Sequence, residues 1–136
     1  MKKPSYYKYK NEKPVIGEIL EHSKLGVHIR LFVWETRAQM QRHVVNKRTK
    51  SPTMVQACFL AKYEERGAWL GDVHFHKEQI GMEDVAHECI HVASKYLRTR
   101  GKWLNGRNEE DFAYLAGGLT AVIVSKLTAA GITLVA

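Results

Sequence analysis

The amino-acid sequence predicts a single α+β domain, because strand-like and helix-like apolar patterns follow one another along its 136 residues. Residues 27–35 alternate between apolar and polar positions and are rich in β-forming residues, which predicts a strand. Residues 54–77 contain two further strand-like segments around a turn at Gly67, which predicts a β-hairpin. Residues 82–97 and 108–128 have helical spacing. With a helix before the hairpin, the expected order is strand, helix, hairpin, helix, helix.

Each predicted helix has a recognisable start. Thr36 can cap the first helix, because its hydroxyl can accept a hydrogen bond from the free backbone N–H groups, and Pro52 falls beyond its end. Glu83 and Asp84 lie in the first turn of the second helix, where the positive end of the macrodipole favours carboxylates. Asn108 is a suitable cap for the third helix.

The two ends of the chain give weaker signals. Residues 1–13 are polar and basic, so we expect a flexible N-terminal arm, and residues 14–136 would then form the single domain. Residues 14–22 fit either a short helix or an extended lead-in. Residues 131–136 fit either a short strand or a tail.

Composition limits the classes of function. The chain is 45% hydrophobic and 26% charged, as in ordinary globular proteins. Its net charge of +7 could favour a weak contact with nucleic acid, but the basic residues are spread along the sequence, which favours a solvated surface. Two cysteines, Cys58 and Cys89, make no disulfide framework. We see no signal peptide and no apolar run that spans a bilayer, and expect a cytoplasmic protein without a membrane partner.

The segment HECIH at residues 87–91 has the spacing of a zinc site. His87 and His91 lie one helical turn apart on one face, so their ring nitrogens can bind the same Zn²⁺ ion. Glu88 can reach a water at the open coordination position and accept its proton. This helix is apolar most of the way round, so we expect it to be buried, with zinc as the partner of its histidines. The alternative is a pair of core histidines satisfied by hydrogen bonds.

A zinc site of this kind needs a third protein ligand, and the last helix offers two candidates. Glu109 and Glu110 open this helix, although acidic residues are also ordinary in a first turn. The apolar stripe of the helix is predicted to contain Phe112, Leu115, Ala116, Leu119 and Ile123. Glu109 lies nearer this stripe. Glu110 lies over Ala113 and Gly117, which are small enough to let another helix come close. Periodicity does not choose between the two glutamates.

Three pieces of the sequence, GDVHFH, VAHECIHVA and NEEDFAYLAG, together resemble the small HExxH zincins of gluzincin type that bacteriophages and prophages encode. The resemblance covers roughly residues 54–128, and nothing in the first 50 residues contributes to it. It implies a minimal zincin-like fold, in which residues 72–76 form the edge strand beside the cleft. It also implies Glu110, two residues before the Phe-Ala-Tyr, as the third ligand, with Glu109 as the alternative, and a host cytoplasm as the location.

The expected function is therefore that of a zinc metallopeptidase, more narrowly a metalloendopeptidase, acting on a polypeptide with Glu88 as general base. His74, His76 and Tyr114 are further candidates, chiefly as hydrogen-bond donors to an oxyanion. Cys89 points away from His91 and is expected in the core. Two alternatives stay open: an inactive zincin-like protein that binds or inhibits a host component, and a basic nucleic-acid-binding protein with a structural zinc.

Overall fold

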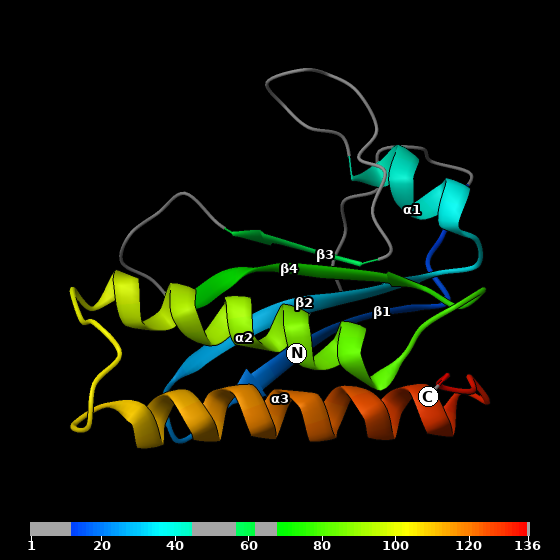
Figure 1. Ribbon diagram of the computed structural model, residues 1–136. Coiled ribbons are helices and arrows are strands. Elements are labelled where there is room, and N and C mark those ends of the chain that lie inside the picture. Colours follow the sequence, from blue (N-terminus) through cyan, green and yellow to red (C-terminus); the bar gives the residue numbers. More distant parts are fainter. Residues whose placement is uncertain (1–11, 45–56, 62–67, 136) are drawn as a thin grey trace.

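The computed structural model describes residues 12–44, 57–61 and 68–135. A four-stranded mixed sheet forms the centre of this structure (Figure 1). Two long helices, α2 (Met82–Thr99) and α3 (Glu109–Ala129), lie on one side of the sheet, and the short helix α1 (Arg37–His43) lies on the other. The predicted α+β class is confirmed.

The sheet combines antiparallel and parallel pairing. Its strands lie in the spatial order β1-β2-β4-β3, with β1 and β3 at the two edges. Strand β2 pairs antiparallel with β1 and parallel with β4, and β4 pairs antiparallel with β3. The four strands are β1 (Ile16–His22), β2 (Val27–Trp34), β3 (Cys58–Ala61) and β4 (Trp69–His76).

The segment at residues 14–22, for which the sequence allowed either a short helix or an extended lead-in, contains strand β1 and is therefore extended. Ile16 and Leu20 are the buried residues of β1, and its other residues are half-buried or exposed. The strand therefore gives only a weak hydrophobic signal in the sequence. Pairing with the apolar β2 holds the segment as a strand. Gly26, with φ of 65°, closes the hairpin, and its N–H donates to the carbonyl of His22 at 2.9 Å.

The expected hairpin between the third and fourth strands is confirmed, but the expected edge strand is wrong. Residues 72–76 belong to β4, which lies between β2 and β3. Leu70, Val73 and Phe75 face the main core, while His74 and His76 are buried on the opposite side. A strand buried on both faces is typical of the interior of a sheet. The short strand β3 is therefore the edge beside α2.

The helix starts are as predicted in two cases out of three. The hydroxyl of Thr36 accepts a hydrogen bond from the N–H of Gln39 at 3.1 Å and caps α1. The carboxylate of Asp84 accepts from the N–H of Gly81 at 2.8 Å at the start of α2. Asn108 stands at the N-cap of α3, but its side chain donates to the carbonyl of Trp103 at 2.6 Å. The Asn108 side chain therefore stabilises the loop before α3 and does not cap the helix.

Several predictions lie outside the described residues. These are the arm at residues 1–11, the break at Pro52 and the turn at Gly67. Helix α1 ends at His43, with Val44 as its C-cap, and is therefore shorter than the predicted helix, which extended to residue 48. At the C-terminal end, Val135 forms a single parallel bridge with Gly81, so a tail with one bridge replaces the suggested short strand.

The main core lies between the sheet and the two long helices. Leu115, Leu119, Ile123 and Leu127 form the buried stripe of α3, which agrees with the apolar stripe expected from the sequence. Among the described residues, α3 is the one helix long and apolar enough to cross a membrane. Core helices often share this length and composition, so the feature does not by itself indicate a membrane span.

Candidate metal centre

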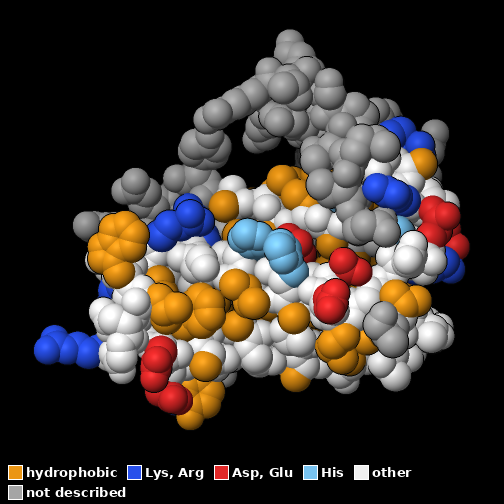
Figure 2. All heavy atoms as spheres, viewed as in Figure 1, with side chains coloured by type: hydrophobic (Ala, Val, Ile, Leu, Met, Phe, Trp, Pro, Cys, Tyr) orange, Lys and Arg blue, Asp and Glu red, His pale blue; other side chains and the backbone are white. Residues whose placement is uncertain are grey.

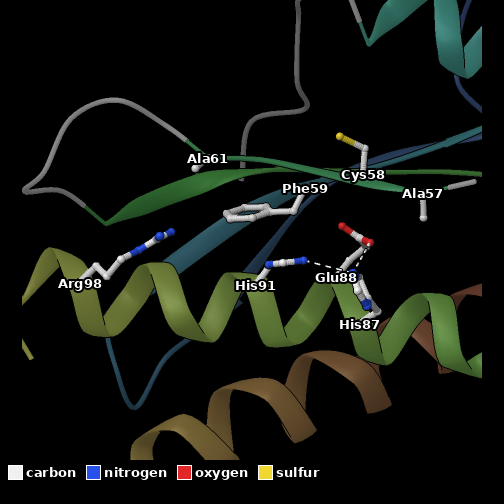
Figure 3. Close-up of a pocket in the computed structure, with 8 residues that line it drawn as sticks. All are labelled: Ala57, Cys58, Phe59, Ala61, His87, Glu88, His91 and Arg98. Carbon is white, nitrogen blue, oxygen red and sulfur yellow. Dashed lines mark hydrogen bonds and ion pairs between the residues drawn. The ribbon is translucent and has the colours of Figure 1, made fainter. Parts of the chain in front are cut away.

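An open pocket of roughly 340 Å³ lies between β3 and α2. Glu88 and the two histidines of the HExxH segment enter it from α2, and the edge strand forms the opposite wall (Figure 3). The pocket is lined by Ala57, Cys58, Phe59, Ala61, His87, Glu88, His91 and Arg98.

The two histidines point their Nε2 atoms at each other across one helical turn. His87 Nε2 and His91 Nε2 are 3.1 Å apart, and the ring planes are inclined by 74° (Figure 3). In tetrahedral zinc sites with Zn–N bonds of 2.0–2.1 Å, two ring nitrogens lie about 3.3 Å apart. The pair therefore has nearly the separation of two ligands of one metal ion. The same separation also fits a hydrogen bond between one protonated and one unprotonated nitrogen.

Glu88 is the buried member of this group. Its side chain is 8% exposed, and Oε2 lies 3.9 Å from His87 Nε2. Burial raises the pKa of Glu88 above its usual value of 4.5, while the two imidazoles and a hydrogen bond from the Phe59 backbone act in the opposite direction. A carboxylate with such opposing influences is suited to accept and release a proton.

The packing of α2 determines which of its side chains face the core and which face the pocket. Val85, Cys89, Val92 and Tyr96 are buried, so the apolar face predicted for this helix is confirmed. The core position of Cys89 is confirmed with it, and burial raises the pKa of its thiol to about 11. Strand β3 contacts α2, and the side of α2 that carries His87 and His91 is exposed.

The expectation of buried histidines is wrong. His87 has a side chain that is 68% exposed, and His91 is exposed as well. Figure 2 shows histidine side chains open to solvent on this face of the molecule. The sequence is apolar most of the way round α2, but Ile90 is 49% exposed, because the sheet and α3 cover only part of the helix. Burial therefore does not require a metal here, and the site depends on its geometry.

The structure does not bring the predicted third ligand to the histidines. Helices α2 and α3 run antiparallel, so the first turn of α3 lies beside the last turn of α2 (Figure 1). That end of α2 is about 10 Å along the helix axis from His91. Glu109 and Glu110 are both exposed there. Within residues 12–44, 57–61 and 68–135, no three His, Cys, Asp or Glu side chains form a group that could hold a metal ion.

The other candidates lie away from the pocket. His74 and His76 share one face of β4, as expected, but that face is buried on the side opposite the main core and does not border the pocket. The ring of His74 stacks on Phe32 at 4.8 Å, and its Nδ1 accepts a hydrogen bond from the indole of Trp34 at 3.1 Å. Tyr114 is 51% exposed on α3.

Five of the residues that line the pocket were not anticipated from the sequence as site residues: Ala57, Cys58, Phe59, Ala61 and Arg98. Cys58 and Phe59 could not be found without knowing that β3 is the edge strand. Burial raises the pKa of Cys58 to about 11, so its thiol is a poor nucleophile. Arg98 had a usable signal, because a residue eleven positions after His87 returns to nearly the same direction around a helix.

Comparison of the chain with protein-family models, with curated proteins and with solved structures finds no match to any of them. The resemblance to the zincins therefore depends on sequence motifs alone, and it stays a prediction.

Proposed function

We propose that this protein is a zinc-dependent metallopeptidase in which His87 and His91 bind the metal and Glu88 transfers the proton. The observation that carries the proposal is the pair of Nε2 atoms 3.1 Å apart, beside a buried glutamate in an open pocket. These donors fit two of the four positions of a tetrahedral zinc site. Bound zinc would lower the pKa of a coordinated water and polarise the carbonyl of the substrate.

The position of Glu88 supports its proposed role as the proton-transferring group. Its carboxylate lies next to the imidazoles, where it can accept a proton from the attacking water and later donate it to the departing amine. The substrate would be a polypeptide, because among the described strands β3 pairs with β4 alone, and an extended chain can add to its outer edge. A chain bound there would lie beside the pocket that Glu88 and the residues of β3 line together.

Zinc titration tests the metal site. We expect protein purified without added metal to bind one equivalent of zinc, and His87→Ala or His91→Ala to weaken binding more than about a hundredfold. His28→Ala, outside the pocket, is the control and should bind like the wild type. Zinc binding that both pocket variants retain would refute the site. Glu109 and Glu110 lie beside the end of α2, about two turns from His91, so Glu109→Gln and Glu110→Gln should keep the wild-type affinity for zinc. A loss of zinc affinity in one of these variants would show that the glutamate is a ligand after all.

A comparison of protein termini tests the reaction. Cells expressing the wild type should contain new polypeptide termini that are missing with Glu88→Gln, although that variant still binds zinc. Glu83→Gln, an exposed carboxylate on the same helix, should give the wild-type pattern. Identical termini with wild type and Glu88→Gln would refute the peptidase. A cellular effect that Glu88→Gln preserves would favour the inactive binding protein.

A further inference from the structure

A stripe of polar residues runs along the open side of α2. At about 100° per residue, His87, His91 and Arg98 point within roughly 40° of one another. Ser94 lies on the same stripe between His91 and Arg98 and carries a small side chain. The stripe therefore has two imidazoles near its middle, a gap of one turn, and a guanidinium at its far end.

Arg98 belongs to the pocket and not only to the helix surface. It lines the same pocket as the histidines, and its guanidinium points from α2 back toward His91 (Figure 3). Among the described residues, the carboxylates that form ion pairs are engaged with other basic side chains, and none lies within ion-pairing distance of Arg98. Within the described part of the chain, Arg98 therefore presents a cation to the pocket and no carboxylate forms an ion pair with it.

The opposite end of the stripe has the opposite charge. Asp84 lies one turn before His87 on nearly the same side of α2, where it accepts a hydrogen bond from the N–H of Gly81. Helix α2 therefore carries an acidic residue before the histidines and a basic residue after them, and of these two residues Arg98 lines the pocket. A ligand that lies along the helix meets an electrostatic gradient, so its orientation is not arbitrary.

We propose that Arg98 is an anion-binding subsite that selects peptide substrates with a carboxylate two or three residues from the scissile bond. Arg98 follows His91 by seven residues, which is about 10 Å along the helix and about three residues of extended peptide. The guanidinium reaches back part of this distance (Figure 3). Its planar fork can hold a carboxylate through two parallel hydrogen bonds. The carboxylate can belong to an acidic side chain or to the C-terminus of the substrate.

The ordinary alternative is a solvated arginine at the rim of a pocket, which is common on basic surfaces. Two observations favour the subsite. The side chain of Arg98 points along the pocket toward His91 (Figure 3). No described carboxylate forms an ion pair with it. The inference rests on the proposed function, because the histidines fix the point from which the peptide is measured.

Peptide hydroxamates test the subsite without turnover, because a hydroxamate is a zinc-binding group and the peptide then extends from the metal. One series carries the hydroxamate at its C-terminus and the other carries a succinyl hydroxamate at its N-terminus, so both chain directions are covered. In each series, Glu is compared with Gln at the second and third residues by calorimetry with zinc-loaded protein. In the second series, C-terminal acids are also compared with amides, which separates the two sources of carboxylate.

We expect one series to bind about tenfold more tightly with the carboxylate than with the amide. Arg98→Gln should reduce this preference to less than about twofold while keeping zinc-dependent binding of the neutral peptides, and Arg98→Glu should favour a Lys-containing peptide. Arg107→Gln removes the same charge from an exposed loop position and should keep the wild-type preference.

The outcomes separate the two proposals. Zinc-dependent binding without a carboxylate preference, or with a preference that Arg98→Gln preserves, would overturn the subsite and leave the metal site intact. If no hydroxamate binds in a zinc-dependent way, the proposed function fails and the subsite fails with it.

Discussion

His74, one of the two buried histidines on β4, should make the stability of the fold sensitive to mild acid. His74 is 5% exposed, and burial lowers its pKa from 6.5 to about 3, with the charges of His43 and Arg30 acting in the same direction. Its hydrogen bonding gives an independent reason. Nδ1 accepts from the Trp34 indole at 3.1 Å, so a proton on Nδ1 would bring two donors together. The folded protein therefore holds His74 neutral.

The size of the effect follows from proton linkage. The folded-state pKa of His74 is depressed, so this stability is complete above the unfolded pKa of 6.5. As the pH falls from 6.5 towards about 3, the unfolded chain binds a proton that the folded chain excludes. The loss approaches about 1.4 kcal/mol per pH unit and amounts to about 2 kcal/mol between pH 7.5 and pH 5.

Urea unfolding followed by tryptophan fluorescence at pH 7.5 and pH 5.0 measures this loss. His74→Asn keeps an acceptor near Trp34 but cannot titrate. We expect the wild type to lose about 2 kcal/mol more than this variant between the two pH values. Phe32→Leu loosens the same cluster and should lower stability at both pH values while keeping the wild-type difference. Equal differences for wild type and His74→Asn would refute a buried, neutral His74.

Three further predictions concern the core, the edge strand and the thiols. Leu115→Ala should lower the free energy of unfolding by about 2–5 kcal/mol in urea titrations, because Leu115 is fully buried; a smaller loss would contradict the packing of α3. Gly71→Ala should release β3 and speed its amide hydrogen exchange, because a Cβ would lie 2.3 Å from the Leu60 carbonyl oxygen and φ is 146°; unchanged exchange would contradict this close approach. Cys58 and Cys89 should react with a disulfide reagent at pH 8 about a hundredfold more slowly when folded than in urea, because burial raises both pKa values to about 11; equal rates would refute their burial.

The sequence alone was sufficient for features that depend on direction around one helix. Four residues of separation place His87 and His91 on one face wherever the helix lies, and their Nε2 atoms do meet. The same periodicity correctly assigned Cys89 to the core and Leu115 to the buried stripe of α3. These predictions succeed because the geometry of a helix is local and repeats at each turn.

Features that depend on which elements become neighbours required the tertiary structure. The parallel pairing of β2 with β4 joins segments about 40 residues apart, and it places β4 inside the sheet and leaves β3 at the edge. The exposure of the histidines also depends on packing, since the side of α2 that packs into the core carries Val85, Cys89 and Val92. The antiparallel pairing of α2 with α3 likewise places Glu110 beside the end of α2 and not beside His91. Periodicity fixes the direction of a side chain about its own axis, but long-range packing decides what that side chain meets.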